Sequence, residues 1–282
     1  EQVKKENSEQ RLAKFLAPFI NLKDGSKNIV EGENLFIAEG TDTVRVLIKG
    51  AAINGIKIKS ILVKPATLFD PPVNLLEEIE SLRQVLTDDE DQQFHVLVGE
   101  EKALSAIAGF QISRGALACG VVPTKNRDEM FLTTLLASSS TLHLLALDGI
   151  CDTANMGSII RCAAAFGIDA IILSHDCCDP WYRRSVRVSM GHIFHIPIIR
   201  VLDLATTIKL MELRNIISYA AVIDPDAELI LEKLVKNEVP SSWCCVMGNE
   251  GSGISKKVAE ACTTRLRISM VSGVDSLSVP IA

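Results

Sequence analysis

Residues 142–167 read LHLLALDGICDTANMGSIIRCAAAFG, and this stretch decides the fold of the second half of the chain. The apolar run 142–147 has the length and composition of one buried strand. Asp148 and Gly149 then turn the chain, and Asn155 is a favourable N-cap for the helix that we expect to follow. Open α/β sheets place their ligands at polar turns of this kind, at the carboxyl ends of their strands.

Segments typical of strands and of helices alternate on both sides of this stretch. In the second half, this alternation predicts an α/β fold with a parallel sheet that is covered on both faces. Residues 123–140 begin with a polar stretch that has no periodicity, and we interpret them as a linker. Strands are expected at 35–38, 60–63, 94–98, 116–121, 170–173, 193–199, 216–222, 243–247 and 265–270, and helices at 9–20, 41–49, 73–84, 100–107, 202–213 and 227–235.

A glycine-rich segment, GNEGSGI at 248–254, follows the expected strand 243–247. Phosphate binding is the obvious interpretation of such a loop, but the lysine and Ser/Thr of a P-loop are absent and Glu250 would repel a phosphate. A carboxylate at this place suits a cationic or hydroxyl-rich ligand better. The alternative is a tight turn that carries a surface glutamate.

A third segment, ISMVSGVDSLSVPIA at 268–282, follows the last expected strand. In this order the three segments resemble the three motifs of the SpoU/TrmH family, which belongs to the SPOUT superfamily. The first motif is matched throughout residues 147–167, and the third is matched less regularly. The resemblance covers about residues 31–282 and is specific only over the three motifs.

The resemblance implies a two-domain α/β protein that transfers a methyl group from S-adenosyl-L-methionine to a ribose 2′-hydroxyl of rRNA or tRNA. It implies a Rossmann-like, parallel-sheet SPOUT domain at 141–282 with a C-terminal trefoil knot, and a homodimer whose contact completes the active site. An N-terminal extension, 1–30, and a small α/β sandwich that binds structured RNA, 31–122, would precede it. Family members need no metal for this reaction.

The resemblance also implies roles for individual residues. Arg161 would orient the ribose and lower the pKa of its hydroxyl, since the high pKa of a guanidinium makes it a poor base. From spacing alone, Asn155 could equally cap a helix and Arg161 could form a surface ion pair. The implied catalytic residues are Asn155, Arg161, Glu250 and Ser276, and the implied cofactor-binding residues are Gly248, Ile268, Met270, Leu277 and Ser278.

Two departures from the family pattern favour an alternative, a catalytically weakened or inactive RNA-binding relative. Ser278 stands where the family has asparagine, and Pro280, which has no amide donor, stands where it has serine. The chain also stops at Ala282, where the family's final helix would begin, and it opens at Glu1, so we expect a fragment or processed form. A nucleotide-dependent oxidoreductase is a second alternative, but it predicts GxGxxG in place of residues 148–152.

Arginines gather at 182–191, YRRSVRVSMG, between the first and second motifs. We predict RNA contacts for Arg183, Arg184 and Arg187, and for Arg114 in the first half, with a solvated helix face as the alternative. His192 and His195 are three residues apart at an expected strand entrance, where such spacing points side chains to opposite faces, so structural histidines are expected rather than metal ligands.

Composition limits the remaining function classes. The 282 residues are 48% apolar but contain no run that approaches the length of a membrane span. A net charge of −6 argues against nucleic-acid binding driven by overall charge. Eight cysteines without CxxC spacing indicate reduced thiols rather than a zinc site or disulfide framework. We therefore expect an intracellular, reducing location, either the cytoplasm or an organelle.

Overall fold

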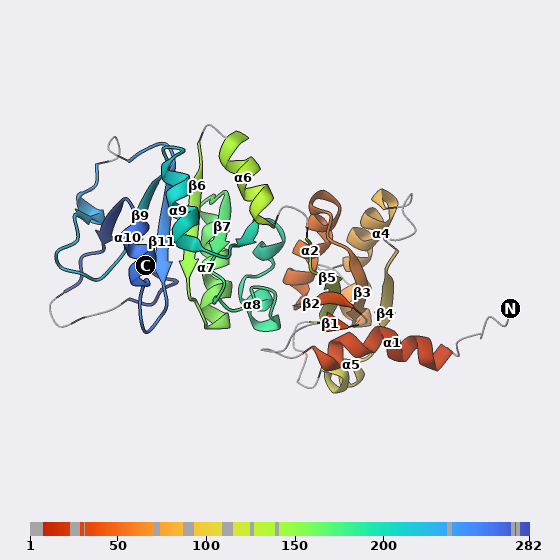
Figure 1. Cartoon of the computed structure of the whole chain (residues 1–282). Helices are drawn as coiled ribbons and strands as arrows, with labels where there is room; N and C mark the ends of the chain where they lie inside the picture. Colours follow the sequence, from red (N-terminus) through yellow and green to blue (C-terminus); the bar gives the residue numbers. More distant parts are fainter. Residues whose placement is uncertain are drawn as a thin grey trace. The chain divides into compact units, whose positions relative to one another are not determined.

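The computed structural model describes residues 8–22, 29–30, 32–69, 74–86, 93–108, 115–124, 127–138, 141–235, 239–271, 274 and 277–282. The chain divides into two compact units (Figure 1). The first unit consists of Glu1–Pro123 together with Trp181–His195, and the second consists of Thr124–Pro180 together with Ile196–Ala282. The segment Trp181–His195, from the C-terminal half of the sequence, therefore folds with the N-terminal half.

The first unit contains a mixed sheet with the strand order β1-β2-β5-β3-β4. Strands β3 and β4 pair in parallel, whereas the other three pairs are antiparallel. Phe19, Leu35, Ile37 and Leu117 are among the buried apolar residues that join the sheet to α1. The elements are α1 (Ser8–Asn21), β1 (Ile29–Val30), β2 (Glu33–Glu39), α2 (Thr41–Asn54), β3 (Ile58–Val63), α3 (Pro65–Phe69), α4 (Leu75–Val85), β4 (His95–Val98), α5 (Glu101–Ala108) and β5 (Ala116–Val121).

The inserted segment Trp181–His195 forms the short helix α8 (Arg183–Val188) and the 3-10 helix η2 (His192–Phe194). An aromatic cluster holds it, because the ring centroids of Trp181 and Phe194 lie 5.0 and 5.3 Å from that of Phe36 on β2. All three side chains are buried. This packing supplies the apolar contact that fixes the insertion in the first unit.

The second unit is built on a seven-stranded sheet with the order β10-β12-β9-β11-β6-β7-β8, in which all neighbouring strands pair in parallel. This confirms the prediction of a parallel-sheet α/β fold for this half. The elements are α6 (Glu129–Ser138), β6 (His143–Asp148), α7 (Thr153–Ala165), β7 (Ala170–Leu173), β8 (Ile198–Arg200), α9 (Leu204–Glu212), β9 (Ile217–Ala221), β10 (Leu229–Ile230), η3 (Leu231–Lys233), β11 (Trp243–Gly248), α10 (Lys256–Ala261) and β12 (Thr264–Arg267).

Helices α6, α9 and α10 share one apolar core with one face of this sheet. Leu144 and Ala146 of β6 belong to that core, while the intervening Leu145 and Leu147 are also buried and point to the other face. Because β6 is buried on both faces, its sequence is an almost continuous apolar run rather than an alternating one.

Three expectations about local structure need correction. The strand expected at 193–199 is only β8, because the chain passes between the two units after His195 and its first residues form η2. The helix expected at 227–235 is β10 and η3, because Leu229 and Ile230 pair with β12 and this pairing overrides helical spacing. Within 123–140, expected as a linker, α6 begins after Asp128, whose carboxylate accepts a hydrogen bond from the Phe131 amide at 2.7 Å.

Within the described ranges, no helix combines the length and the apolar character that a membrane crossing requires.

Candidate active site

The site begins where the two central strands of the second unit end. Strands β6 and β11 pair in parallel with Asp148 opposite Gly248, so the turns that follow them emerge side by side. Asp148 is buried and its carboxylate accepts a hydrogen bond of 2.7 Å from the Ser255 amide, which lies beyond the glycine-rich loop. The sheet therefore brings the first and second sequence motifs together.

The glycine-rich loop, residues 249–254, folds tightly back on its own start. The Asn249 and Gly253 backbones exchange two hydrogen bonds of 2.9 Å. A Cβ on Gly248 would come within 2.1 Å of the Ile254 nitrogen, so only glycine fits there. The Asn249 side-chain oxygen accepts from the Gly251 and Ser252 amides at 2.9 and 3.0 Å. The requirement for glycine at 248 thus comes from the loop itself.

Asn249 also ties this loop to the first motif. Its side-chain nitrogen donates to the Gly149 carbonyl at 2.7 Å. Our sequence prediction did not include Asn249, although asparagine in a turn commonly bonds neighbouring backbone groups in this way. The residue joins the two loops that follow β6 and β11, and it is part of the architecture of the site.

Helix α7 begins one turn earlier than expected. Asp152 is its N-cap and accepts a 2.8 Å hydrogen bond from the Asn155 amide, so the prediction that Asn155 is the N-cap is wrong. The amide donor lies three positions after the N-cap residue, which is the usual spacing for a capping carboxylate. Because Asp152 satisfies this amide, the Asn155 side chain is free to point toward the second loop.

That side chain meets Glu250. The Asn155 side-chain nitrogen donates to the Glu250 carboxylate at 3.0 Å, and the Asn249 side-chain nitrogen and the Asp152 amide reach the same carboxylate at 3.4 Å. Asn155 and Glu250, both predicted catalytic residues, are therefore brought together. Arg161 makes no hydrogen bond to either of them: it is exposed, and no group in the described ranges forms a hydrogen bond or ion pair with its guanidinium.

A cavity of about 890 Å³ opens beside the glycine-rich loop. Four of the five predicted cofactor-binding residues, Gly248, Ile268, Met270 and Leu277, line it, whereas Ser278 is not among the lining residues. Glu250 lines it as well. The segment after β12 and the loop after β11 thus form two walls of one cavity, although they lie in different sequence motifs.

The chemistry of the cavity wall is unusual for a nucleotide site. It contains two carboxylates, Asp224 and Glu250, and no lysine, arginine or histidine among the described residues that line it. The remaining wall is largely apolar and includes the indole of Trp243 and the side chains of Leu231 and Leu266. Such a wall disfavours a phosphorylated ligand and suits a ligand that combines apolar surface with positive charge.

Comparisons with known proteins agree with this geometry. The model of the SpoU rRNA Methylase family matches residues 143–282. The 23S rRNA (guanosine-2′-O-)-methyltransferase RlmB of Photorhabdus laumondii is 33% identical over 174 residues, which cover 60% of this chain and 69% of RlmB. The chain belongs to the SpoU rRNA Methylase family. A Mycobacterium tuberculosis relative, named as an uncharacterized tRNA/rRNA methyltransferase, is 33% identical over 64% of this chain, and the match spans 60% of that relative's length.

Solved structures of SpoU-type proteins share the fold over almost the whole chain. An AdoMet-bound rRNA methyltransferase from Sinorhizobium meliloti superposes with a TM-score of 0.70 at 22% identity, covering 98% of this chain and 92% of its own. The SpoU methyltransferase AviRb from Streptomyces viridochromogenes, in complex with AdoMet, gives 0.69 at 17% identity, covering 98% and 94%. Both units of this SpoU protein therefore have counterparts in known folds.

The arginines predicted to bind RNA differ in their surroundings. Arg183 is nearly buried and pairs with Glu39 at 3.1 Å, while Arg187 is half exposed and reaches the other oxygen of Glu39 at 3.3 Å. Arg184 is exposed. Arg114 and the predicted catalytic Ser276 lie outside the described residues.

The surroundings of His195 and of the cysteines bear on the question of a metal site. His195 lies 3.4 Å from the Asn54 side-chain nitrogen, and burial lowers its pKa. No group of three or more His, Cys, Asp or Glu suited to a metal ion occurs in the described part of the chain. All eight cysteines are free thiols, and burial raises the pKa of Cys119, Cys178 and Cys262 to about 12.

Proposed function

We propose that this SpoU protein transfers a methyl group from S-adenosyl-L-methionine to a ribose 2′-hydroxyl of rRNA or tRNA. The observation that carries the proposal is the cavity between the glycine-rich loop and the segment after β12. Residues from two SpoU motifs line this cavity. Its described wall is partly apolar and contains no lysine, arginine or histidine, which suits this cofactor. The names of the relatives support the same reaction class.

The residues present fit the cofactor's chemistry. S-adenosyl-L-methionine carries a sulfonium and an ammonium against one carboxylate, so its net charge is positive, and its adenine offers a flat apolar surface. Gly248, Ile268, Met270 and Leu277 would hold it along the walls. Ser278, next to Leu277 in the sequence, is a further proposed contact. When bound, the cofactor supplies a methyl group on a sulfonium, which is an excellent leaving group. The protein therefore needs to align the attacking oxygen more than to supply a strong base.

Asn155 and Glu250 would shape the place where that oxygen arrives. Three donors, the side chains of Asn155 and Asn249 and the Asp152 amide, hold the Glu250 carboxylate, so its position is fixed before a substrate binds. Arg161 would grip the ribose-phosphate and stabilise developing negative charge on the 2′-oxygen, as a fixed cation that does not take the proton. The hydroxyl proton would pass to water. Ser276 completes the proposed catalytic set.

The RNA is the proposed partner of the first unit. A structured RNA would be positioned by the α/β sandwich at 31–122, with Arg114, Arg184 and Arg187 as proposed contacts. Arg183, also predicted to contact RNA, pairs with Glu39 and would not contact a phosphate. Arg184 and Arg187 have the exposure that a phosphate contact needs. A homodimer would bring groups of the partner subunit to Arg161, and a trefoil knot in the segment after β12 is part of the same proposal.

A labelling experiment tests the reaction. The protein and its Arg161→Ala variant are incubated with RNA and methyl-labelled S-adenosyl-L-methionine, and the RNA is digested to nucleosides. We expect label in 2′-O-methylribose with the parent and at least about 100-fold less with the variant. Cofactor binding without label in either protein would overturn the proposed activity and favour an inactive RNA-binding relative. Label on a base would contradict the ribose assignment.

A further inference from the structure

The second carboxylate of the cavity, Asp224, lies away from the glycine-rich loop in sequence. It follows β9, the neighbour of β11 in the sheet, and it belongs to the turn that leads to β10. Asp224 lines the cavity and its side chain is 38% exposed, so the carboxylate is accessible to a ligand. None of the three SpoU motifs includes this turn.

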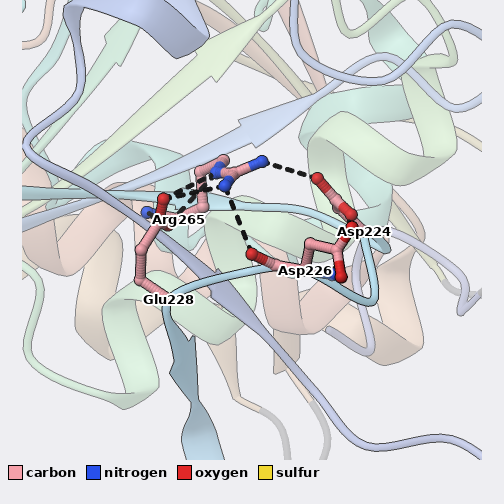
Figure 2. A network of polar contacts seen from close by, with 4 residues as sticks. All are labelled: Asp224, Asp226, Glu228 and Arg265. Atoms are coloured by element: carbon pink, nitrogen blue, oxygen red, sulfur yellow. Dashed lines mark hydrogen bonds and ion pairs between the residues drawn. The ribbon is translucent and has the colours of Figure 1, made fainter.

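Arg265 on β12 holds the turn in place through all parts of its guanidinium (Figure 2). Its Nη1 donates to the Asp224 carboxylate at 2.6 Å, and its Nη2 donates to the Asp226 carbonyl at 3.2 Å. Its Nε and Nη2 donate to the Glu228 carboxylate at 3.1 and 2.8 Å. The hydrogen bonds from Arg265 lower the pKa of Glu228 to about 2. A planar arginine fork can fix several acceptors at once, which lysine cannot do.

The contacts of Asp224 leave it room for a ligand. One carboxylate oxygen accepts from Arg265, and the other accepts from the Asp226 amide at 2.9 Å. A carboxylate has about four acceptor positions, so two remain after these hydrogen bonds. Because both oxygens are already held, their free positions have a fixed direction, and little ordering remains to be done when a ligand binds.

We propose that Asp224 is a specificity-determining residue of the cofactor cavity, where it accepts hydrogen bonds from a ligand donor, and that Arg265 is its positioning residue. The inference rests on the proposed function. The donor is either the ribose hydroxyl pair or the ammonium of S-adenosyl-L-methionine, because both present N–H or O–H groups that a carboxylate accepts. A negative charge here also excludes ligands that carry phosphates.

Asp224→Asn tests the role of the charge, and Asp226→Asn is its matched control. Asp226 lies in the same turn, is exposed and does not line the cavity, so the control removes an equal charge without touching the wall. Binding is measured by calorimetry with S-adenosyl-L-methionine. We expect Asp224→Asn to weaken binding about tenfold, as for loss of a hydrogen bond to a charged group, and Asp226→Asn to change it less than about twofold. Arg265→Lys should weaken binding by an intermediate factor.

Ligand analogues identify the donor, and the comparison of two analogues on the parent protein needs no variant. 5′-Deoxy-5′-methylthioadenosine keeps the ribose hydroxyls and lacks the ammonium, and its 2′,3′-dideoxy form lacks both. If the hydroxyls are the donors, Asp224→Asn weakens methylthioadenosine binding, and the parent binds the dideoxy form more weakly. If the ammonium is the donor, only S-adenosyl-L-methionine loses affinity in the variant.

The outcomes separate this inference from the proposed function. A parent protein that fails to bind S-adenosyl-L-methionine overturns the proposed function and the role of Asp224 together. A parent that binds, with Asp224→Asn and Asp226→Asn indistinguishable for every ligand, overturns the role of Asp224 alone. In a parent that binds, equal affinity for methylthioadenosine and its dideoxy form excludes the hydroxyls as the donor.

Discussion

Arg161 on α7 and Arg183 on α8 are both predicted site residues, but the structure surrounds their guanidinium groups differently. Arg183, on α8, pairs with Glu39, and the two side chains are only 11% and 12% exposed. Arg161, on α7, is exposed and is not paired within the described ranges. One cation is used within the protein, and the other remains available to a substrate or a partner subunit.

The difference shows why a count of basic residues is a poor guide to an RNA surface. The segment 182–191 is the most basic of its region, and that density led us to predict three RNA contacts there. Two of the three arginines share one carboxylate, Glu39, which the sequence places about 145 residues away. Because one acidic residue of a distant strand pairs with the nearly buried Arg183, the number of arginines in this segment overstates the charge that is available to RNA.

The largest expected effect belongs to the unpaired arginine. Arg161→Lys keeps a positive charge but loses the planar fork, so we expect kcat to fall by at least about tenfold and by more in Arg161→Ala. The affinity for S-adenosyl-L-methionine and the melting temperature should stay unchanged, because no described group depends on this side chain. A loss of melting temperature in either variant would show that Arg161 is structural.

The paired arginine should behave in the opposite way. Arg183→Ala removes a nearly buried, charge-assisted hydrogen bond to Glu39 and should lower the free energy of unfolding of the first unit by about 2 kcal/mol. In a Trp243→Phe background, the remaining tryptophan, Trp181, reports denaturant unfolding of that unit. Arg187→Ala is the matched control. It removes the half-exposed partner of Glu39 and should cost about 0.5 kcal/mol. Equal losses in both variants would contradict the comparison.

The salt dependence of RNA binding should distinguish the three arginines of the segment 182–191. Replacing exposed Arg184 or Arg187 by alanine should reduce the slope of log K against log salt concentration by about 1, as expected for one lost phosphate contact. Arg183→Ala should leave the slope unchanged, since its guanidinium is engaged by Glu39. The measurement is a filter-binding titration with structured RNA at several salt concentrations. A reduced slope for Arg183→Ala would place that arginine on the RNA.

The smallest effect concerns a third use of arginine, in which Arg265 holds Glu228 at the surface. The pKa of Glu228 is lowered to about 2, below the value of about 4.3 expected in the unfolded chain. The contribution of this pair to stability is therefore fully present above about pH 5 and is lost as the pH falls toward 2. Above about pH 5, Glu228→Gln should therefore melt at a lower temperature than the parent. As the pH falls toward 2, the two melting temperatures should converge. A difference that persists at the lowest pH would argue against the pair.

Much of the site could be predicted because its motifs are local. The strand and turn at 142–149 and the loop at 248–254 carry their own signals, an apolar run and a set of glycines. Asn155 and Glu250 are predicted from separate motifs, and the structure brings them into contact because β6 and β11 are neighbours whose carboxyl ends lie side by side. No sequence motif indicates Asp224, because its proposed role in the cavity depends on Arg265, about 40 residues further along the chain.

The sequence by itself determined that this chain has a parallel-sheet α/β half with the SpoU motifs at its strand ends, because periodicity, glycines and short motifs act over neighbouring residues. Only the tertiary structure decided that Trp181–His195 folds with the first unit, that Asp152 rather than Asn155 caps α7, and that Glu39 takes up Arg183. Each of these depends on a specific partner, most of them distant in the chain. Which partner a charge or an aromatic ring receives is settled by packing, and packing is a property of the whole fold.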